Sequence, residues 1–120
     1  MARYEHLPLF KDVYDFNLYF FKLSRGFPKD FKYGLGQEIR EQTTCLLDQI
    51  VLANDSTDKE PYLKKAVSCI ETIKVKIRML KDLEILNMTS YNFTSVSLMK
   101  ISKQINAWKT WSEKGRSQSY

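Results

Sequence analysis

Residues 27–40 read FPKDFKYGLGQEIR, and this stretch decides the fold because it separates two helical patterns. Pro28 prevents the preceding helix from continuing, since its ring removes a backbone donor and clashes with the turn before it. Gly34 and Gly36 then stand where the next helix should begin, although each glycine costs about 1 kcal/mol relative to alanine inside a helix. Their position indicates that the second helix starts with its backbone close to a neighbouring segment.

Apolar residues on either side of this stretch recur at gaps of three and four, the spacing of one helix face. The loops between the stripes are short, so consecutive helices should be neighbours in space. We therefore predict an all-α, antiparallel up-down-up-down four-helix bundle, formed by residues 1–115 as a single domain and followed by a short polar tail at 116–120. The four stripes predict helices at about residues 5–26, 31–54, 59–86 and 90–114.

Residues that favour helix ends flank these stripes. Gly26 is predicted to stop the first helix, and Asp30 to cap the start of the second. The third should begin at Asp58 with Pro61 in its first turn, and the fourth at Thr89.

The composition is that of a compact domain with a modest positive charge. The chain has 120 residues, 43% of them hydrophobic, with 4 Gly and 3 Pro, which argues against disorder. We see neither a membrane-length apolar run nor a signal peptide, and we expect a cytoplasmic protein with no membrane partner. The formal net charge of +5, from 19 Lys and Arg against 14 Asp and Glu, biases partners towards polyanions without establishing nucleic-acid binding.

Side chains suited to catalysis are scarce. His6 is the only histidine and lies near the N-terminus, so the core cannot hold a Ser-His or Cys-His nucleophile pair. Glu-x-x-His motifs and phosphate-binding glycine loops do not occur. We expect no enzymatic activity, no catalytic residue, no cofactor and no metal.

The two cysteines are Cys45 and Cys69, which lie equally far from the turn near Thr57. An antiparallel helix pair would place them at about the same height, where a disulfide is conceivable if both point across one interface. A cytoplasmic setting disfavours that bond, so we expect reduced thiols in the core.

Lysine and arginine residues gather on the third and fourth predicted helices. Lys74, Arg78 and Lys81 are spaced i, i+4 and i+7 and share one face, which could take a polyanion. Lys100 and Lys103 form a second basic region on the fourth helix. The alternative interpretation is a solvated face with no partner.

Aromatic residues exceed what the core of one small bundle needs. Tyr19 and Phe21 lie on different sides of the first helix, so part of this surface should meet another subunit. On the fourth helix, Trp108 belongs to the apolar stripe, whereas Trp111 is a candidate interface residue. We therefore predict self-association.

Several short elements also carry a family resemblance that covers nearly the whole chain. With them the chain resembles the accessory variability determinant proteins of diversity-generating retroelements, within a wider group of four-helix proteins that includes those encoded in ribosomal RNA intervening sequences. The elements are Tyr14-Asp15-Phe16, Phe27-Pro28-Lys29, residues 33–39, residues 73–80 and Ala107-Trp108. The run from Cys45 to Ile50 is closer to the accessory branch, although Asn106 stands where that branch often has glycine.

This resemblance implies a fold, an assembly and a role. It implies a homopentameric barrel of four-helix bundles with a positively charged surface, which works with the retroelement's reverse transcriptase and template-repeat RNA in mutagenic retrohoming. The protein itself would be a non-catalytic accessory that binds the enzyme and RNA, with DNA as a further candidate. The competing interpretation is a ribosomal intervening-sequence type of bundle with a structural or protein-interaction role.

The resemblance also ranks the cations. Lys74 and Arg78 match the basic pair on the family's third helix. The resemblance therefore implies that these two residues contact nucleic acid or reverse transcriptase. Lys81, Lys100 and Lys103 complete the candidate set. Lys76 lies on another side of the helix and is a weaker candidate.

Overall fold

The computed structural model describes residues 4–117, and every regular element in this range is helical. A 3-10 turn η1 precedes α1, and a one-turn helix α2 precedes α3. The elements are η1 (Tyr4–His6), α1 (Pro8–Ser24), α2 (Lys29–Lys32), α3 (Leu35–Asp55), α4 (Glu60–Asp82) and α5 (Met88–Ser117).

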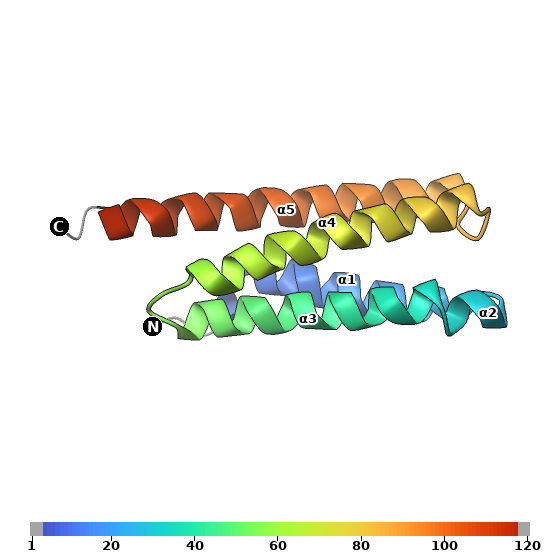
Figure 1. Cartoon of the computed structure of the whole chain (residues 1–120), viewed down its shortest axis with the longest axis horizontal. Helices are drawn as coiled ribbons and strands as arrows, with labels where there is room; N and C mark the ends of the chain where they lie inside the picture. Colours follow the sequence, from blue (N-terminus) through green and yellow to red (C-terminus); the bar gives the residue numbers. More distant parts are fainter. Residues whose placement is uncertain (1–3, 118–120) are drawn as a thin grey trace.

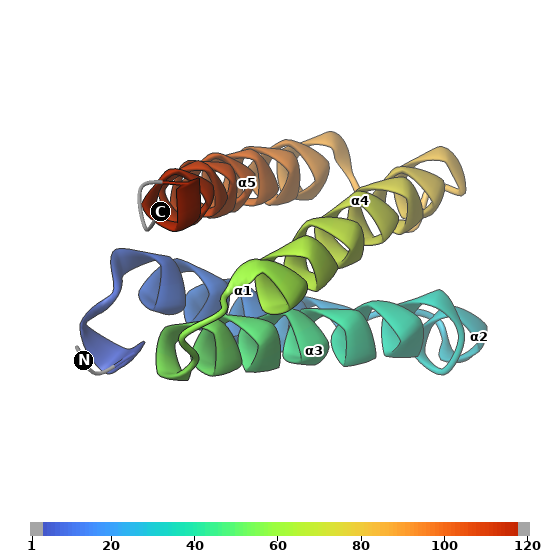
Figure 2. The same cartoon turned by 60° about the vertical axis from the view of Figure 1, so that its left-hand side comes forward.

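The four long helices run alternately up and down the molecule (Figure 1), which confirms the predicted all-α architecture. The helix α2 lies at the far end of the bundle, where the chain turns from α1 into α3. The domain is elongated, with Cα extents of 54 × 22 × 21 Å. In the turned view, α4 crosses between α3 and α5 (Figure 2). No helix of the described part combines the length and apolarity needed to cross a membrane.

The core depends on the stripe of α4, whose buried side chains are each at most 1% exposed. They meet the stripes of the three other long helices in one hydrophobic cluster. Asn17 is a buried polar exception, and its amide donates to the carbonyls of Val13 (3.0 Å) and Thr43 (2.9 Å), joining α1 to α3. The α4 stripe consists of Leu63, Ala66, Ile70, Ile73, Ile77 and Leu80.

The corner at residues 27–40 is packed as tightly as its glycines indicate. A Cβ at Gly34 would lie 2.6 Å from the Asp30 carbonyl oxygen, and one at Gly36 would lie 2.8 Å from that of Phe31 and 3.2 Å from the Phe27 ring. Only glycine lets α3 start against the backbone of α2. The prediction of a close backbone approach is therefore confirmed.

Two predicted helix starts were wrong. The second helix is split, because the chain leaves helical geometry between Lys32 and Leu35, and Asp30 lies inside α2 instead of capping α3. The predicted stop of the first helix at Gly26 is confirmed, because α1 ends at Ser24 and Gly26 directly follows its C-cap residue Arg25. The start of α5 is capped by Asn87, whose side chain accepts from the Ser90 amide (2.8 Å), and not by Thr89.

The start of α4 agrees better with the prediction. The Asp58 carboxylate accepts a hydrogen bond from the Glu60 amide (3.3 Å), and Pro61 lies in the first turn. Lys59 next to it donates to the carbonyls of Ala53 (2.9 Å) and Ser56 (2.8 Å), which satisfies the end of α3.

Both cysteines are free and half-buried at the edge of the core between α3 and α4. They are thus less enclosed than the predicted core thiols. Burial, together with the neighbouring Cys45 thiol, raises the pKa of Cys69 to about 11. Because the thiolate is the nucleophile, Cys69 should be unreactive near neutral pH.

Aromatic residues of α1 have two different surroundings. Tyr19 is half-buried, with its ring centroid 4.6 Å from that of Phe93 on α5, so it serves the fold of one chain. Tyr14, Leu18 and Phe21 are 41–45% exposed and form a stripe at i, i+4 and i+7. Of Tyr19 and Phe21, which lie on different sides of α1 as predicted, only Phe21 is exposed.

We expect Gly36→Leu to lower the free energy of unfolding by about 1–3 kcal/mol, because the added side chain must push α2 away from α3. Gly26→Leu is the control, since a Cβ there meets only the Leu23 carbonyl oxygen at an ordinary 3.7 Å. Urea unfolding followed by circular dichroism measures both. A Gly36→Leu protein with wild-type stability and mass would contradict the packing role.

We expect iodoacetamide to modify Cys69 at pH 8.5 much more slowly in the folded protein than in urea. The raised pKa keeps the folded thiol protonated, and its reactivity should grow as the pH approaches 11. Peptide mapping of the modified wild-type protein follows Cys69 separately from Cys45, and keeps the Cys45 thiol that contributes to the raised pKa. Equal rates for the folded and unfolded chains would show that the Cys69 thiol is not protected.

Candidate functional site

Charge is unevenly divided among the four long helices. The helix α4 carries six basic and three acidic residues, and α5 carries five basic and one acidic. By contrast, α3 has one basic and four acidic residues, and on α1 two of each sign cancel. The basic charge is therefore concentrated on α4 and α5, which are adjacent in the bundle (Figures 1 and 2).

A groove of about 370 Å³ lies between these two basic helices. We call it the α4/α5 groove. Ile77 and Leu98 form its buried floor, and the cationic residues Lys74 and Lys103 line it from opposite helices. Its lining residues are Lys74, Ile77, Tyr91, Ser95, Leu98, Met99, Ser102 and Lys103.

Two further predicted cations lie along α4 beyond Lys74. The Lys81 ammonium sits 4.9 Å from the centroid of the Tyr91 ring and 3.8 Å from the Asp82 carboxylate. Arg78 is exposed and lies 3.7 Å from Asp82, an i,i+4 pair. Such surface pairs contribute at most about 1 kcal/mol, so these cations can exchange partners at little cost.

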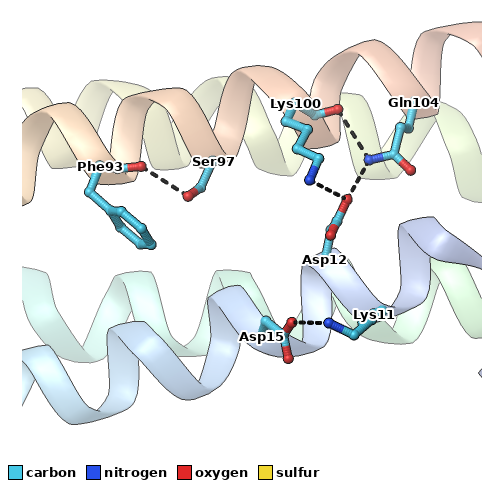
Figure 3. Close-up of polar contacts among 7 residues, drawn as sticks. All are labelled: Lys11, Asp12, Asp15, Phe93, Ser97, Lys100 and Gln104. Carbon is cyan, nitrogen blue, oxygen red and sulfur yellow. Dashed lines mark hydrogen bonds and ion pairs between the residues drawn. The ribbon is translucent and has the colours of Figure 1, made fainter.

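Lys100 lies apart from the other four predicted residues. Its ammonium reaches across to α1, 3.7 Å from the Asp12 carboxylate, which also accepts a hydrogen bond from Gln104 (2.7 Å; Figure 3). A small cavity of about 130 Å³ lies along this α1/α5 seam, next to Phe93 and Asp15. The structure thus brings Lys74 and Lys103 together and turns Lys100 towards another helix.

Lys76 has a structural position, as its predicted orientation on another side of the helix implied. Its ammonium bridges to α3 through Glu38 (3.1 Å) and Gln42 (3.1 Å), and its side chain is only 24% exposed. It therefore joins α3 to α4 and is poorly placed to meet a ligand.

The apolar and hydroxyl residues that line the groove from α5 were not among the predicted site residues. Tyr91, Ser95, Leu98, Met99 and Ser102 recur at gaps of four, three, one and three, so one flank of the helix carries them all. That periodicity was present in the sequence. Which neighbouring helix this flank faces became clear only from the fold.

Within residues 4–117, no three His, Cys, Asp or Glu side chains cluster closely enough to hold a metal ion. Trp111 is 65% exposed near the end of α5. Trp108 is half-buried, and its ring centroid lies 5.7 Å from the Lys59 ammonium.

Comparison with known proteins supplies the family. A search of curated proteins found no match. A family model described as bAvd-like matches residues 9–111, a segment that includes the corner at residues 27–40, the α4 stripe and the α4/α5 groove. Because this match covers most of the 120 residues, the chain belongs to the bAvd-like family, the accessory variability determinant proteins of diversity-generating retroelements.

Proposed function

We propose that the protein is a non-catalytic accessory factor of a diversity-generating retroelement. In this role it binds the reverse transcriptase and the template RNA through the basic surface of α4 and α5, and so supports mutagenic retrohoming. The observation that carries the proposal is the concentration of basic residues on these two adjacent helices, while α3 is acidic. Membership of the bAvd-like family favours this role over that of a ribosomal intervening-sequence protein.

The physical basis of RNA binding is neutralisation of phosphates. Lysine and arginine release the counterions condensed on RNA when they contact its backbone, so affinity falls as salt rises. Arg78 is well placed for this contact, because its side chain is 74% exposed. Lys74 lies one turn away with a side chain that is 48% exposed.

Self-association would strengthen this binding. Each chain has a formal charge of +5, so a pentamer concentrates about +25 on one particle. The exposed stripe of Tyr14, Leu18 and Phe21 on α1 supports an assembled state, because single chains seldom expose large contiguous apolar patches. Contacts with phosphates position RNA without reading its bases, so the partner enzyme would supply sequence selectivity.

We expect the double variant Lys74→Glu/Arg78→Glu to weaken binding of a 30-nucleotide single-stranded RNA by about tenfold or more at low salt. The loss of two phosphate contacts should also reduce the slope of log affinity against log salt by about 1–2. Fluorescence anisotropy at several salt concentrations measures both effects.

The double variant Lys11→Glu/Lys22→Glu on α1 makes the same change in net charge and is the matched control. It should lose much less affinity. Equal losses in the two variants would mean that total charge matters and the α4 face does not. Unchanged binding with a flat salt dependence would remove the RNA-binding proposal.

We expect light scattering at micromolar concentration to give a mass near that of five 14.2 kDa chains, about 71 kDa. Leu18→Glu should lower this mass, because it places a charge in the exposed apolar stripe of α1. Lys22→Glu, outside that stripe, should leave it unchanged. A monomeric wild-type mass would contradict self-association.

A further inference from the structure

The α4/α5 groove combines an apolar interior with a cationic rim. Ile77 and Leu98, each 1% exposed, close its floor, while Met99 is 52% exposed and forms an accessible apolar wall. Ser95 and Ser102 line it with short side chains and so leave space between the helices. Methionine adapts to the shape of an apolar partner, which makes this wall suited to contact with a protein.

The charges at the rim are available for a partner. Lys103 is exposed, and its side chain makes no ion pair or hydrogen bond with the residues that the structure describes. Among the described residues, Lys74 pairs only with Glu71 on its own helix, at 3.2 Å, and both side chains are about half exposed. A carboxylate from a partner can therefore replace Glu71 with little loss of energy.

The groove is poorly suited to nucleic-acid bases. Binding of unpaired bases relies on stacking against aromatic faces. The groove has one aromatic lining residue, Tyr91, which is half-buried and already has the Lys81 ammonium 4.9 Å from its ring centroid. The remaining apolar lining residues are aliphatic or thioether side chains, which fit leucine or isoleucine better than a base.

A second copy of the chain is also a poor occupant. The acidic helix α3 is the part with complementary charge, yet Leu52 is the only large apolar side chain that it exposes. One such residue would fill little of a groove of about 370 Å³.

We propose that the α4/α5 groove binds an acidic amphipathic helix of a protein partner. The apolar face of that helix would pack beside Met99 and over Ile77 and Leu98, and its carboxylates would meet Lys74 and Lys103. This is the helix-in-groove mode of recognition. The inference rests on the proposed function, because it assigns the apolar interior of the groove to the protein partner. Arg78 lies outside the lining and is left to the RNA phosphates, whereas Lys74 at the rim is within reach of both partners.

The test uses a fluorescein-labelled 18-residue peptide that carries leucine at helical i, i+3, i+4 and i+7 spacing and glutamate elsewhere. A scrambled peptide of the same composition keeps the charge but has no apolar face. Met99→Glu places a charge inside the groove, and Val96→Glu places the same charge one turn away, at a residue that is 59% exposed and outside the lining.

We expect the wild-type protein to bind the amphipathic peptide at least about tenfold more tightly than the scrambled one. Met99→Glu should weaken peptide binding by at least about tenfold, and Val96→Glu by less than about threefold. Binding of the 30-nucleotide RNA should be the same in the two variants.

Three results would overturn the proposal. Equal binding of the two peptides would mean that charge alone is recognised. A loss of RNA affinity confined to Met99→Glu would assign the groove to RNA, and a change in mass by light scattering confined to that variant would assign it to a second copy. The RNA-binding proposal fails separately, if Lys74→Glu/Arg78→Glu leaves RNA affinity unchanged while Met99→Glu still abolishes peptide binding.

Discussion

Burial of the α4 stripe is the constraint on which the rest of the structure depends. This helix contacts α3 on one side and α5 on the other, so the rotation that buries Ile73, Ile77 and Leu80 also determines where every other residue of α4 points. Lys76 is turned towards α3, where it is held by Glu38 and Gln42. Lys74 is turned towards α5 and the α4/α5 groove.

The same constraint divides the lysines into those that hold the helices together and those that are available to a ligand. Lysines that face α3 or the ends of helices are engaged within the chain, as Lys76 and Lys59 are. On the α5 side, Lys74 has a weak partner on its own helix, and the side chain of Lys103 on α5 has no ion-pair or hydrogen-bond partner among the described residues. A single helix can therefore hold the bundle together and still offer cations to a ligand, because the two tasks use different sides of one apolar stripe.

The sequence predicted the helical class, the order of the helices and the close packing at Gly34 and Gly36, because periodicity and glycine placement are local signals. It missed the separation of α2 from α3, where Gly34 leaves helical geometry with φ −105° and ψ −110°. Its five candidate cations were chosen by spacing along single helices. Spacing could not tell that Lys100 turns to Asp12 on α1 while Lys103 turns to the groove.

The sequence by itself determined the four amphipathic helices, their antiparallel order and the family, because each rests on residues near one another along the chain. Only the tertiary structure decided which cations are free and what they surround. Met99, Tyr91 and Ser95 become part of a groove because α5 packs beside α4, and a contact between two helices depends on the rotation of both. A one-dimensional pattern describes each helix alone and does not contain that relation.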